Sequence, residues 1–202
     1  NTGPKTYFGN CALKTPNIST FGFTGFACYL PRLFGAFAPI GDYLIADASE
    51  GHEDRYANPE FVAPGVIVVW GNEPLKSNAD GYIGHWLAQC VQMGSKIISI
   101  DPRITWVGAH DGNINLQVRP QTDTALALAI MNLMFENGEY DQEFAEKWIY
   151  GLDDMKARAA EYPVDKVAEI TGVDAEDIKR VAHIIGTERP IGWAWGLAFD
   201  QN

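Results

Sequence analysis

Short apolar runs alternate with segments of helical periodicity along residues 65–202. Val66 to Val69 are four consecutive apolar residues, a pattern typical of a strand that is covered on both faces of a parallel sheet. Lys96 to Ile100 repeats this pattern after a gap long enough for one helix. Two further stretches, Ile114 to Val118 and Pro190 to Trp195, also have the composition of strands. The pattern therefore predicts four strands of one parallel sheet.

Helical periodicity occupies the intervals between these strands. Residues 80–93 repeat apolar positions at helical spacing, and Asp80 is the predicted cap of this helix. A long helix is predicted from Thr124 to about Glu136, with Thr122 or Asp123 as its cap. Shorter helices are predicted at residues 142–150, 153–161, 164–171 and 175–186.

This alternation of strands and helices indicates an α/β fold. We expect a Rossmann-like, doubly wound parallel sheet with a helical carboxyl-terminal portion, formed by residues 65–202. Residues 1–64 are rich in glycine, proline and aromatic side chains, and we expect them to be irregular or helical. An extended stretch is predicted near residues 7–13 and a helix at about residues 33–46. Both parts are predicted to belong to one structural domain.

Composition narrows the class of function. A formal net charge of −11 and a pI near 4.7 argue against a nucleic-acid-binding surface, which needs clustered basic residues. Apolar runs stay well below the roughly 20 residues of a membrane-spanning helix, so no transmembrane segment is expected. Cys11, Cys28 and Cys90 form no Cys-x-x-Cys pair, which argues against a zinc site or a disulfide framework and leaves the cellular location open. Because the chain begins at Asn1 without a methionine, we expect a fragment of a larger polypeptide.

Polar loops follow each predicted strand. Parallel sheets of this kind bind ligands at the carboxyl ends of their strands. The loops at these ends are rich in glycine, asparagine, aspartate or proline, as expected of backbone that approaches a ligand closely. They comprise Trp70 to Pro74, Asp101 to Arg103, Gln121 to Asp123 and Gly196 to Asn202. We expect a ligand to lie against these four loops.

Side chains in these loops suit a nucleotide. Asn72 could face a phosphate or a pterin edge, and Asp101 could accept hydrogen bonds from ribose hydroxyls. Arg103 could bind phosphate oxygens, and Asp123 could accept from the N–H groups of guanine. Each residue taken singly is as well explained by a strand-ending turn, a helix cap or a surface ion pair. Their succession at neighbouring strand ends favours a nucleotide-bearing ligand.

Three motifs within these loops resemble the central domain of the dimethyl sulfoxide reductase family of molybdenum and tungsten enzymes. They are Trp70-Gly71-Asn72-Glu73-Pro74, Asp101-Pro102-Arg103 and Arg119-Pro120-Gln121-Thr122-Asp123, in the order and spacing of that family. The resemblance covers about residues 15–202. It implies that the parent protein binds two molybdopterin guanine dinucleotides, which hold one molybdenum or tungsten ion through dithiolenes.

The resemblance also implies roles for individual residues. Gly71 and Asn72 would contact the pterin–phosphate part of one dinucleotide, Asp101 the ribose, and Asp123 the guanine. Further cofactor-binding positions implied by the same loops are Trp70, Pro74, Pro102, Arg103, Gln121, Thr122, Gly196 and Gln201. Gln121 departs from the family, which usually has glycine there, and its side chain would crowd the dinucleotide.

Cys28 is the implied metal ligand and catalytic residue. Many members of the family ligate the metal through one protein atom about forty residues before the Trp-Gly-Asn loop, and a thiolate suits a soft, sulfur-bound metal. The flanking sequences, Pro16 to Thr20 and Tyr29 to Pro31, resemble those of a cysteine ligand. They are similar to the branch that includes acetylene hydratase and anaerobic aromatic dehydroxylases. Without the resemblance, Cys28 is better explained as a small buried hydrophobic residue.

These features predict a fragment of the catalytic subunit of a molybdenum- or tungsten-dependent oxidoreductase, which is inactive when isolated. The parent would be an anaerobic reductase or dehydroxylase of a small substrate. Its remaining domains, a [4Fe–4S] cluster and an electron-transfer iron–sulfur subunit would lie outside this chain. One alternative is an NAD-binding dehydrogenase domain, which predicts Gly-x-Gly-x-x-Gly where the sequence has Gly71-Asn72-Glu73-Pro74-Leu75-Lys76. Another alternative is a non-catalytic scaffold or binding domain.

Overall fold

The computed structural model describes residues 8–14, 35, 38, 41, 61–77, 82–110, 112–196 and 199. The chain divides into one compact unit of residues 1–46 with Gln201 and another of residues 47–200 with Asn202. In the first unit, Phe8–Ala12 forms a π-helical turn. The extended stretch expected at residues 7–13 is therefore wrong, because the Leu13 N–H bonds back to the Phe8 carbonyl at 3.0 Å.

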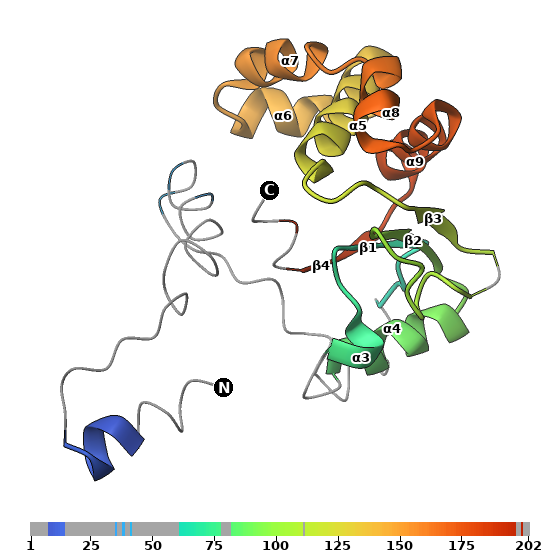
Figure 1. Ribbon diagram of the computed structural model, residues 1–202. Coiled ribbons are helices and arrows are strands. Elements are labelled where there is room, and N and C mark those ends of the chain that lie inside the picture. Colours follow the sequence, from blue (N-terminus) through green and yellow to red (C-terminus); the bar gives the residue numbers. More distant parts are fainter. Residues whose placement is uncertain are drawn as a thin grey trace. The chain divides into compact units, whose positions relative to one another are not determined.

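The second unit is built on a parallel sheet of four strands, with the order β3-β2-β1-β4 among the described residues (Figure 1). Val66 lies opposite both Lys96 and Ile191, so β1 is paired on its two edges. This arrangement confirms the α/β prediction and places β1 at the centre. The strands are β1 (Val66–Trp70), β2 (Lys96–Ile100), β3 (Ile114–Leu116) and β4 (Ile191–Trp195).

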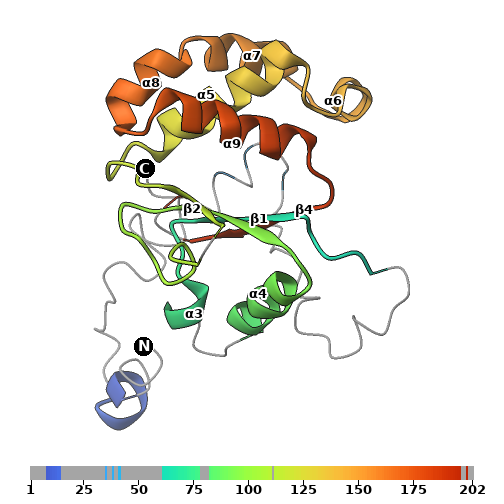
Figure 2. The ribbon, with the colours of Figure 1, turned by 90° about the vertical axis from the view of Figure 1, so that its right-hand side faces the viewer.

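Helices cover both faces of this sheet (Figure 2). One face carries α3 (Pro74–Ser77) and α4 (Tyr82–Gln92). The other carries a layer of α5 (Asp123–Asn137), α6 (Gln142–Trp148), α7 (Leu152–Ala160), α8 (Val164–Thr171) and α9 (Ala175–Thr187). All of the helices expected after residue 80 are present, whereas α3 was not expected. Asp80, the expected cap of α4, lies outside the described residues.

Two apolar cores lie on the two sides of the sheet. Val66, Val68 and Trp70 point toward the layer of α5, α8 and α9, whereas Ile67 and Val69 pack toward α4. All five side chains of β1 are at most 5% exposed, which explains why this strand is apolar at every position. Because both faces of β1 are covered, its one polar side-chain contact among the described residues is made by Trp70 at the end of the strand.

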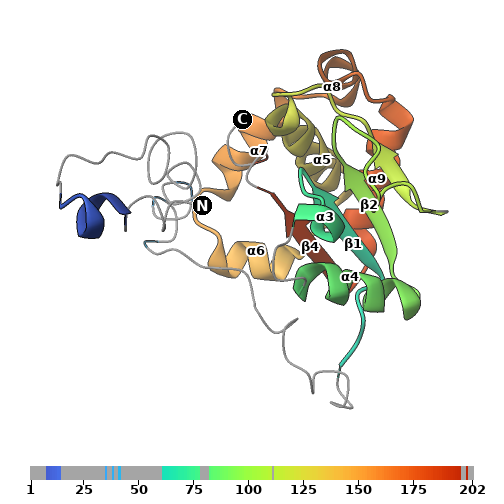
Figure 3. The ribbon, with the colours of Figure 1, turned by 60° about the horizontal axis from the view of Figure 1, so that its bottom comes forward.

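The helical layer extends beyond the sheet. The ribbon shows α6 and α8 at opposite ends of this layer, and β4 running beside β1 (Figure 3). Asp141 caps α6 by accepting from the Phe144 N–H, and Asp174 caps α9 by accepting from the Glu176 N–H. These caps satisfy backbone donors that a helix leaves unpaired at its first turn.

Candidate functional site

The first and fourth strand-end loops meet at the carboxyl edge of the sheet. The Gly196 N–H donates to the Trp70 carbonyl at 2.8 Å, and the Gly71 N–H donates to the Ile100 carbonyl at 2.8 Å. A Cβ atom on Gly196 would overlap the carbonyl oxygen of Gly71. Gly71 itself has φ +57°, a left-handed conformation that glycine adopts without steric cost. Gly196 is therefore required by the close approach of two backbones, and Gly71 is favoured by its left-handed backbone.

The third loop is fastened to the same strand end by a buried hydrogen bond. The indole Nε1–H of Trp70 donates to Asp123 Oδ1 at 2.7 Å, and both residues are less than 9% exposed. The ring of Phe199 lies 4.7 Å from the Trp70 ring. Asp123 therefore stands at the first turn of α5 with one carboxylate oxygen already engaged by β1.

Thr122 occupies the N-cap position of α5, as one of the two expected residues. Its side chain makes no capping hydrogen bond, because its hydroxyl donates instead to the Arg119 carbonyl at 2.7 Å. Gln121, just before it, has φ +67° and an exposed side chain. The backbone at this position thus has the left-handed conformation that favours glycine.

The second loop carries an ion pair. Asp101 is 6% exposed, and its Oδ1 accepts from the Arg103 backbone N–H at 2.9 Å and from Arg103 Nε at 3.2 Å. The hydrogen bond to Asp101, and then the negative charge of Asp101, raise the pKa of Arg103 above its usual value. The guanidinium remains solvent-accessible, with 77% of its side chain exposed. Arg103 is therefore a fixed positive charge that is open to a ligand.

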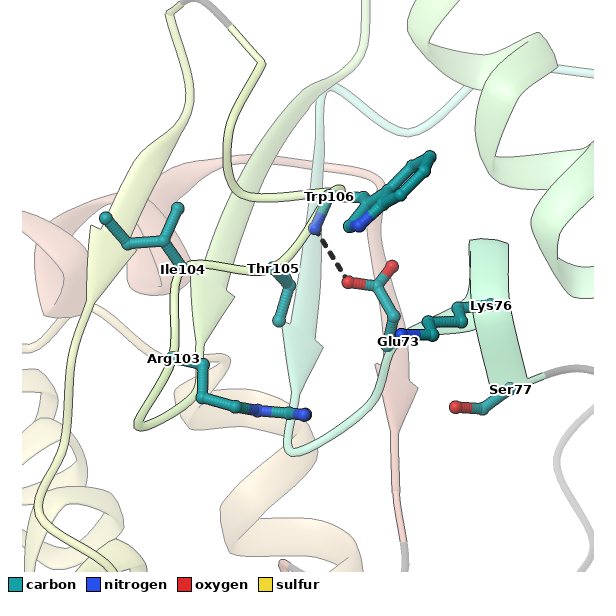
Figure 4. Close-up of a pocket in the computed structure, with 7 residues that line it drawn as sticks. All are labelled: Glu73, Lys76, Ser77, Arg103, Ile104, Thr105 and Trp106. Carbon is teal, nitrogen blue, oxygen red and sulfur yellow. Dashed lines mark hydrogen bonds between the residues drawn. The ribbon is translucent and has the colours of Figure 1, made fainter.

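A pocket of about 430 Å³ lies between the first two loops (Figure 4). Glu73 stands beneath it and is only 7% exposed. Its Oε2 accepts from the Trp106 backbone N–H at 2.8 Å, whereas its buried Oε1 has no hydrogen-bond partner among the described residues. The pocket is lined by Glu73, Lys76, Ser77, Arg103, Ile104, Thr105 and Trp106.

Sequence reasoning missed most of this pocket. Of the lining residues, the sequence predicts only Arg103 as a site residue, and it places Glu73 in the turn after the first strand. The available signal was a carboxylate directly before Pro74 and an aromatic residue shortly after Arg103. Neither signal predicts that Glu73 and Trp106, which are 33 positions apart, would meet.

Other predicted site residues are only partly located. Asn72 is half-buried between β1 and α3, Pro74 is buried at the start of α3, and Pro102 is exposed. Cys28 and Gln201 lie outside the described residues. Within the part of the chain that the structure describes, no group of three histidine, cysteine or acidic side chains could hold a metal ion. The assignment of Cys28 as a metal ligand stays a prediction.

No protein-family model matches the chain, but individual proteins do. It is 40% identical to acetylene hydratase of Syntrophotalea acetylenica over 124 residues, which are 58% of this chain. It is 28% identical to the dimethyl sulfoxide reductase DmsA of Haemophilus influenzae over its whole length, and 30% identical to DmsA of Escherichia coli over 80% of its length. The structure of acetylene hydratase from Pelobacter acetylenicus superposes on 69% of the chain with a TM-score of 0.62 and 36% identity.

The chain belongs to the dimethyl sulfoxide reductase family. It spans only 17%, 28% and 24% of the lengths of these three sequence relatives, and 19% of the acetylene hydratase structure. It is thus a fragment by comparison with them. The comparisons confirm the family resemblance and the α/β fold.

Enzymes of the dimethyl sulfoxide reductase family use a molybdopterin cofactor with molybdenum or tungsten. The carboxyl edge of this sheet fits such a group. Gly196 lets the fourth loop pack against the backbone of the first loop, Arg103 offers an exposed guanidinium, and Glu73 holds a buried oxygen without a partner among the described residues. In the described part of the chain no helix is long and apolar enough to cross a membrane.

Proposed function

We propose that this chain binds molybdopterin guanine dinucleotide at the carboxyl edge of its sheet, as part of the catalytic subunit of a molybdenum or tungsten oxidoreductase. One observation carries the proposal: loops far apart in sequence are fastened together at this edge. Gly196 bonds to Trp70, and Trp70 bonds to Asp123. Holding these loops together costs conformational entropy. Doubly wound sheets bind their ligands at this same edge, which supports a ligand site here.

Each loop would hold a different part of the dinucleotide. The backbone of Gly71 and the side chain of Asn72 would face the pterin–phosphate part, and Arg103 would face phosphate oxygens. Asp101 would accept from ribose hydroxyls, and Asp123 would lie toward the guanine. The bound cofactor supplies the redox chemistry, whereas these residues supply position and charge.

Arg103 is prepared for this role before any ligand arrives. Its Nε is directed by Asp101, so the orientation of the guanidinium is set by a buried carboxylate. Because the side chain is already held in one orientation, less conformational entropy is lost when a ligand binds. The Asp101–Arg103 pair is therefore a preorganised phosphate clamp in this proposal.

The metal and the remaining cofactors extend the proposal beyond the described residues. Cys28 would ligate the metal, a second dinucleotide would complete the centre, and a [4Fe–4S] cluster and an iron–sulfur subunit would lie in other parts of the assembly. The parent would act on a small molecule as an anaerobic reductase or dehydroxylase. Relatives named as a hydratase and as reductases show that the family framework serves more than one reaction.

An apolar surface on the helical layer supports the presence of further domains. Five large apolar residues of α6, the following loop and α7 are exposed, with Trp148 at 67% and Tyr150 at 103%. Since the chain spans 28% or less of the relatives' lengths, we propose that the rest of the parent polypeptide covers this surface. The residues of this docking surface are Phe144, Trp148, Ile149, Tyr150 and Met155.

Cofactor analysis of the full-length parent tests the proposal. The protein would be purified without oxygen, and molybdenum, tungsten, pterin and released guanine nucleotide would be quantified beside a Cys28→Ala variant. We expect near-stoichiometric metal with two pterins per metal, and an altered metal spectrum in the variant. Absence of both metals and of pterin would reject the proposal and favour the scaffold alternative. Bound NAD in their place would favour the dehydrogenase alternative.

A further inference from the structure

Glu73 presents a buried acceptor without a donor. The residue is 7% exposed, and its Oε2 is held by the Trp106 backbone N–H at 2.8 Å. Its Oε1 is buried and has no partner among the described residues. Figure 4 shows the carboxylate facing the pocket between α3 and the loop after β2. A buried polar atom in this state is costly unless a ligand supplies the missing donor.

The surroundings of this oxygen specify the kind of ligand. Lys76 and Arg103 bring positive charge to opposite sides of the pocket, so phosphate groups are favoured near its mouth (Figure 4). Trp106 offers an indole that is 74% exposed, against which a flat ring can stack. A carboxylate acceptor, an aromatic face and two cations together suit a phosphorylated heterocycle whose ring carries N–H donors.

Heterocycles differ in the edge that they present to a carboxylate. Guanine and pterin share a 2-amino-4-oxopyrimidine edge, which places a ring N–H and an amino group side by side as donors. Adenine presents a ring nitrogen acceptor beside its amino group, and this acceptor would face the carboxylate with like polarity. A carboxylate at this position would therefore discriminate between these rings by charge and hydrogen bonding rather than by size.

We propose that Glu73 is a specificity-determining residue whose Oε1 accepts from the 2-amino-4-oxopyrimidine edge of guanine or pterin. The inference rests on the proposed function, because both rings occur in molybdopterin guanine dinucleotide. It adds a recognition residue in the first loop to the contacts proposed for Asp101 and Asp123. Asp123 already accepts from the Trp70 indole at 2.7 Å, so Glu73 has the acceptor that lacks a donor.

Ligand binding to the full-length, cofactor-free protein tests this inference. Equilibrium dialysis would compare GMP, AMP and 6-carboxypterin. The wild-type protein is expected to bind GMP or 6-carboxypterin about tenfold more tightly than AMP, which is the order of one hydrogen bond to a charged group. Glu73→Gln should abolish this preference, because the side-chain NH2 group would replace the Oε1 acceptor, and AMP binding should become tighter rather than weaker.

Two further variants control for other effects. Glu188→Gln removes one negative charge near Gly65, at the opposite end of β1, and is expected to keep the preference. Trp106→Ala removes an exposed ring and should weaken the binding of all three ligands by a similar factor. Loss of the GMP preference alone assigns Glu73 to guanine, and loss of the 6-carboxypterin preference assigns it to pterin.

Two results would overturn the inference. One is a wild-type protein that binds AMP as tightly as both other ligands, which needs no variant and holds even if Glu73→Gln misfolds. The other is a folded Glu73→Gln protein, checked by circular dichroism, that retains the wild-type preference. Metal and pterin analysis of the holoprotein is independent of both results. A protein that contains metal and pterin but shows no effect of Glu73→Gln would reject this inference and leave the proposed function in place.

Discussion

The indole of Trp70 and the carboxylate of Asp123 form a 2.7 Å hydrogen bond between residues 53 positions apart. Trp70 ends the central strand, and Asp123 begins the longest described helix. Both side chains are buried, so water does not compete for this bond. It fixes the start of α5 relative to β1 and thereby sets the position of the third loop.

Trp70→Phe is expected to destabilise the fold. Phenylalanine retains much of the ring packing but removes the N–H donor, so Asp123 keeps a buried charge with one partner fewer. The expected loss is about 1–3 kcal/mol in the free energy of unfolding. Urea unfolding followed by far-UV circular dichroism measures it. Trp193→Phe on β4 is the matched control, because Trp193 is 42% exposed, and equal losses in both variants would contradict the expectation.

Gly196→Ala is expected to separate the first and fourth loops. The added Cβ would overlap the Gly71 carbonyl, so the backbone must shift at a cost of roughly 1–3 kcal/mol. Cofactor content of the full-length variant should fall along with its thermal stability. At Gly35 an added Cβ meets nothing within 4 Å, so Gly35→Ala should leave cofactor content unchanged. A Gly196→Ala protein with full cofactor content would show that the close contact between the Gly196 and Gly71 backbones is not required for cofactor binding.

Gln121→Gly is expected to stabilise the third loop slightly. The left-handed backbone at φ +67° costs a non-glycine residue roughly 1–2 kcal/mol, and glycine loses about 0.5–1 kcal/mol of this gain through its freer unfolded state. The net gain is therefore about 0.5–1 kcal/mol, measurable by urea unfolding. Gln121→Val should be destabilising, because a β-branched side chain tolerates this conformation poorly. If Gln121→Val were more stable than Gln121→Gly, the left-handed backbone at this position would not be strained.

Asp101→Asn is expected to weaken phosphate binding relative to wild type. The factor of weakening should be the same at every pH between 6 and 9, a window of about three units. The pKa of Arg103 is raised by its hydrogen bond to Asp101, so the stabilising charge is present at all pH values below the ordinary arginine pKa. It is lost only as pH rises through the raised pKa. Dialysis of GMP at several pH values would measure the effect. Glu161→Gln, which removes the partner of exposed Arg158, should have no effect on binding.

Trp148→Ser is expected to weaken the contact between this domain and the rest of the parent. The indole is 67% exposed in this chain, so its removal should leave the domain itself intact. In the full-length protein its loss should cost about 1–3 kcal/mol, if the docking surface is covered there. Thermal unfolding of the parent measures this cost. Met93→Ser, at an exposed position after α4, is the control, and an unchanged Trp148→Ser parent would argue against a covered surface.

The strands and most helices could be predicted because their signals are local. Val66 to Val69 are apolar at every position, and burial on both faces of a parallel sheet requires that pattern. β3 ends at Leu116 rather than at the expected Val118, because the Val118 N–H turns back to the Leu116 carbonyl. α3 has only four residues, which is too short to show helical periodicity.

The site was only partly predictable because its contacts are distant in sequence. The motifs placed Asp101, Arg103 and Asp123 at strand ends, and the structure has them there. The partners of these residues depend on tertiary packing, so neither the Trp70–Asp123 bond nor the Glu73–Trp106 bond could be read from spacing. Cys28 depends on the family resemblance alone and remains a prediction.

The position of β4 has a consequence for biosynthesis. It is the last described strand, yet it pairs with the inner strand β1, and Gly196 follows it directly. A ribosome must therefore release residue 196 before the carboxyl edge can close. Until then β1 has an unpaired edge of the kind that promotes association between chains. Any ligand that needs the closed carboxyl edge can therefore bind only after the ribosome has synthesised residue 196.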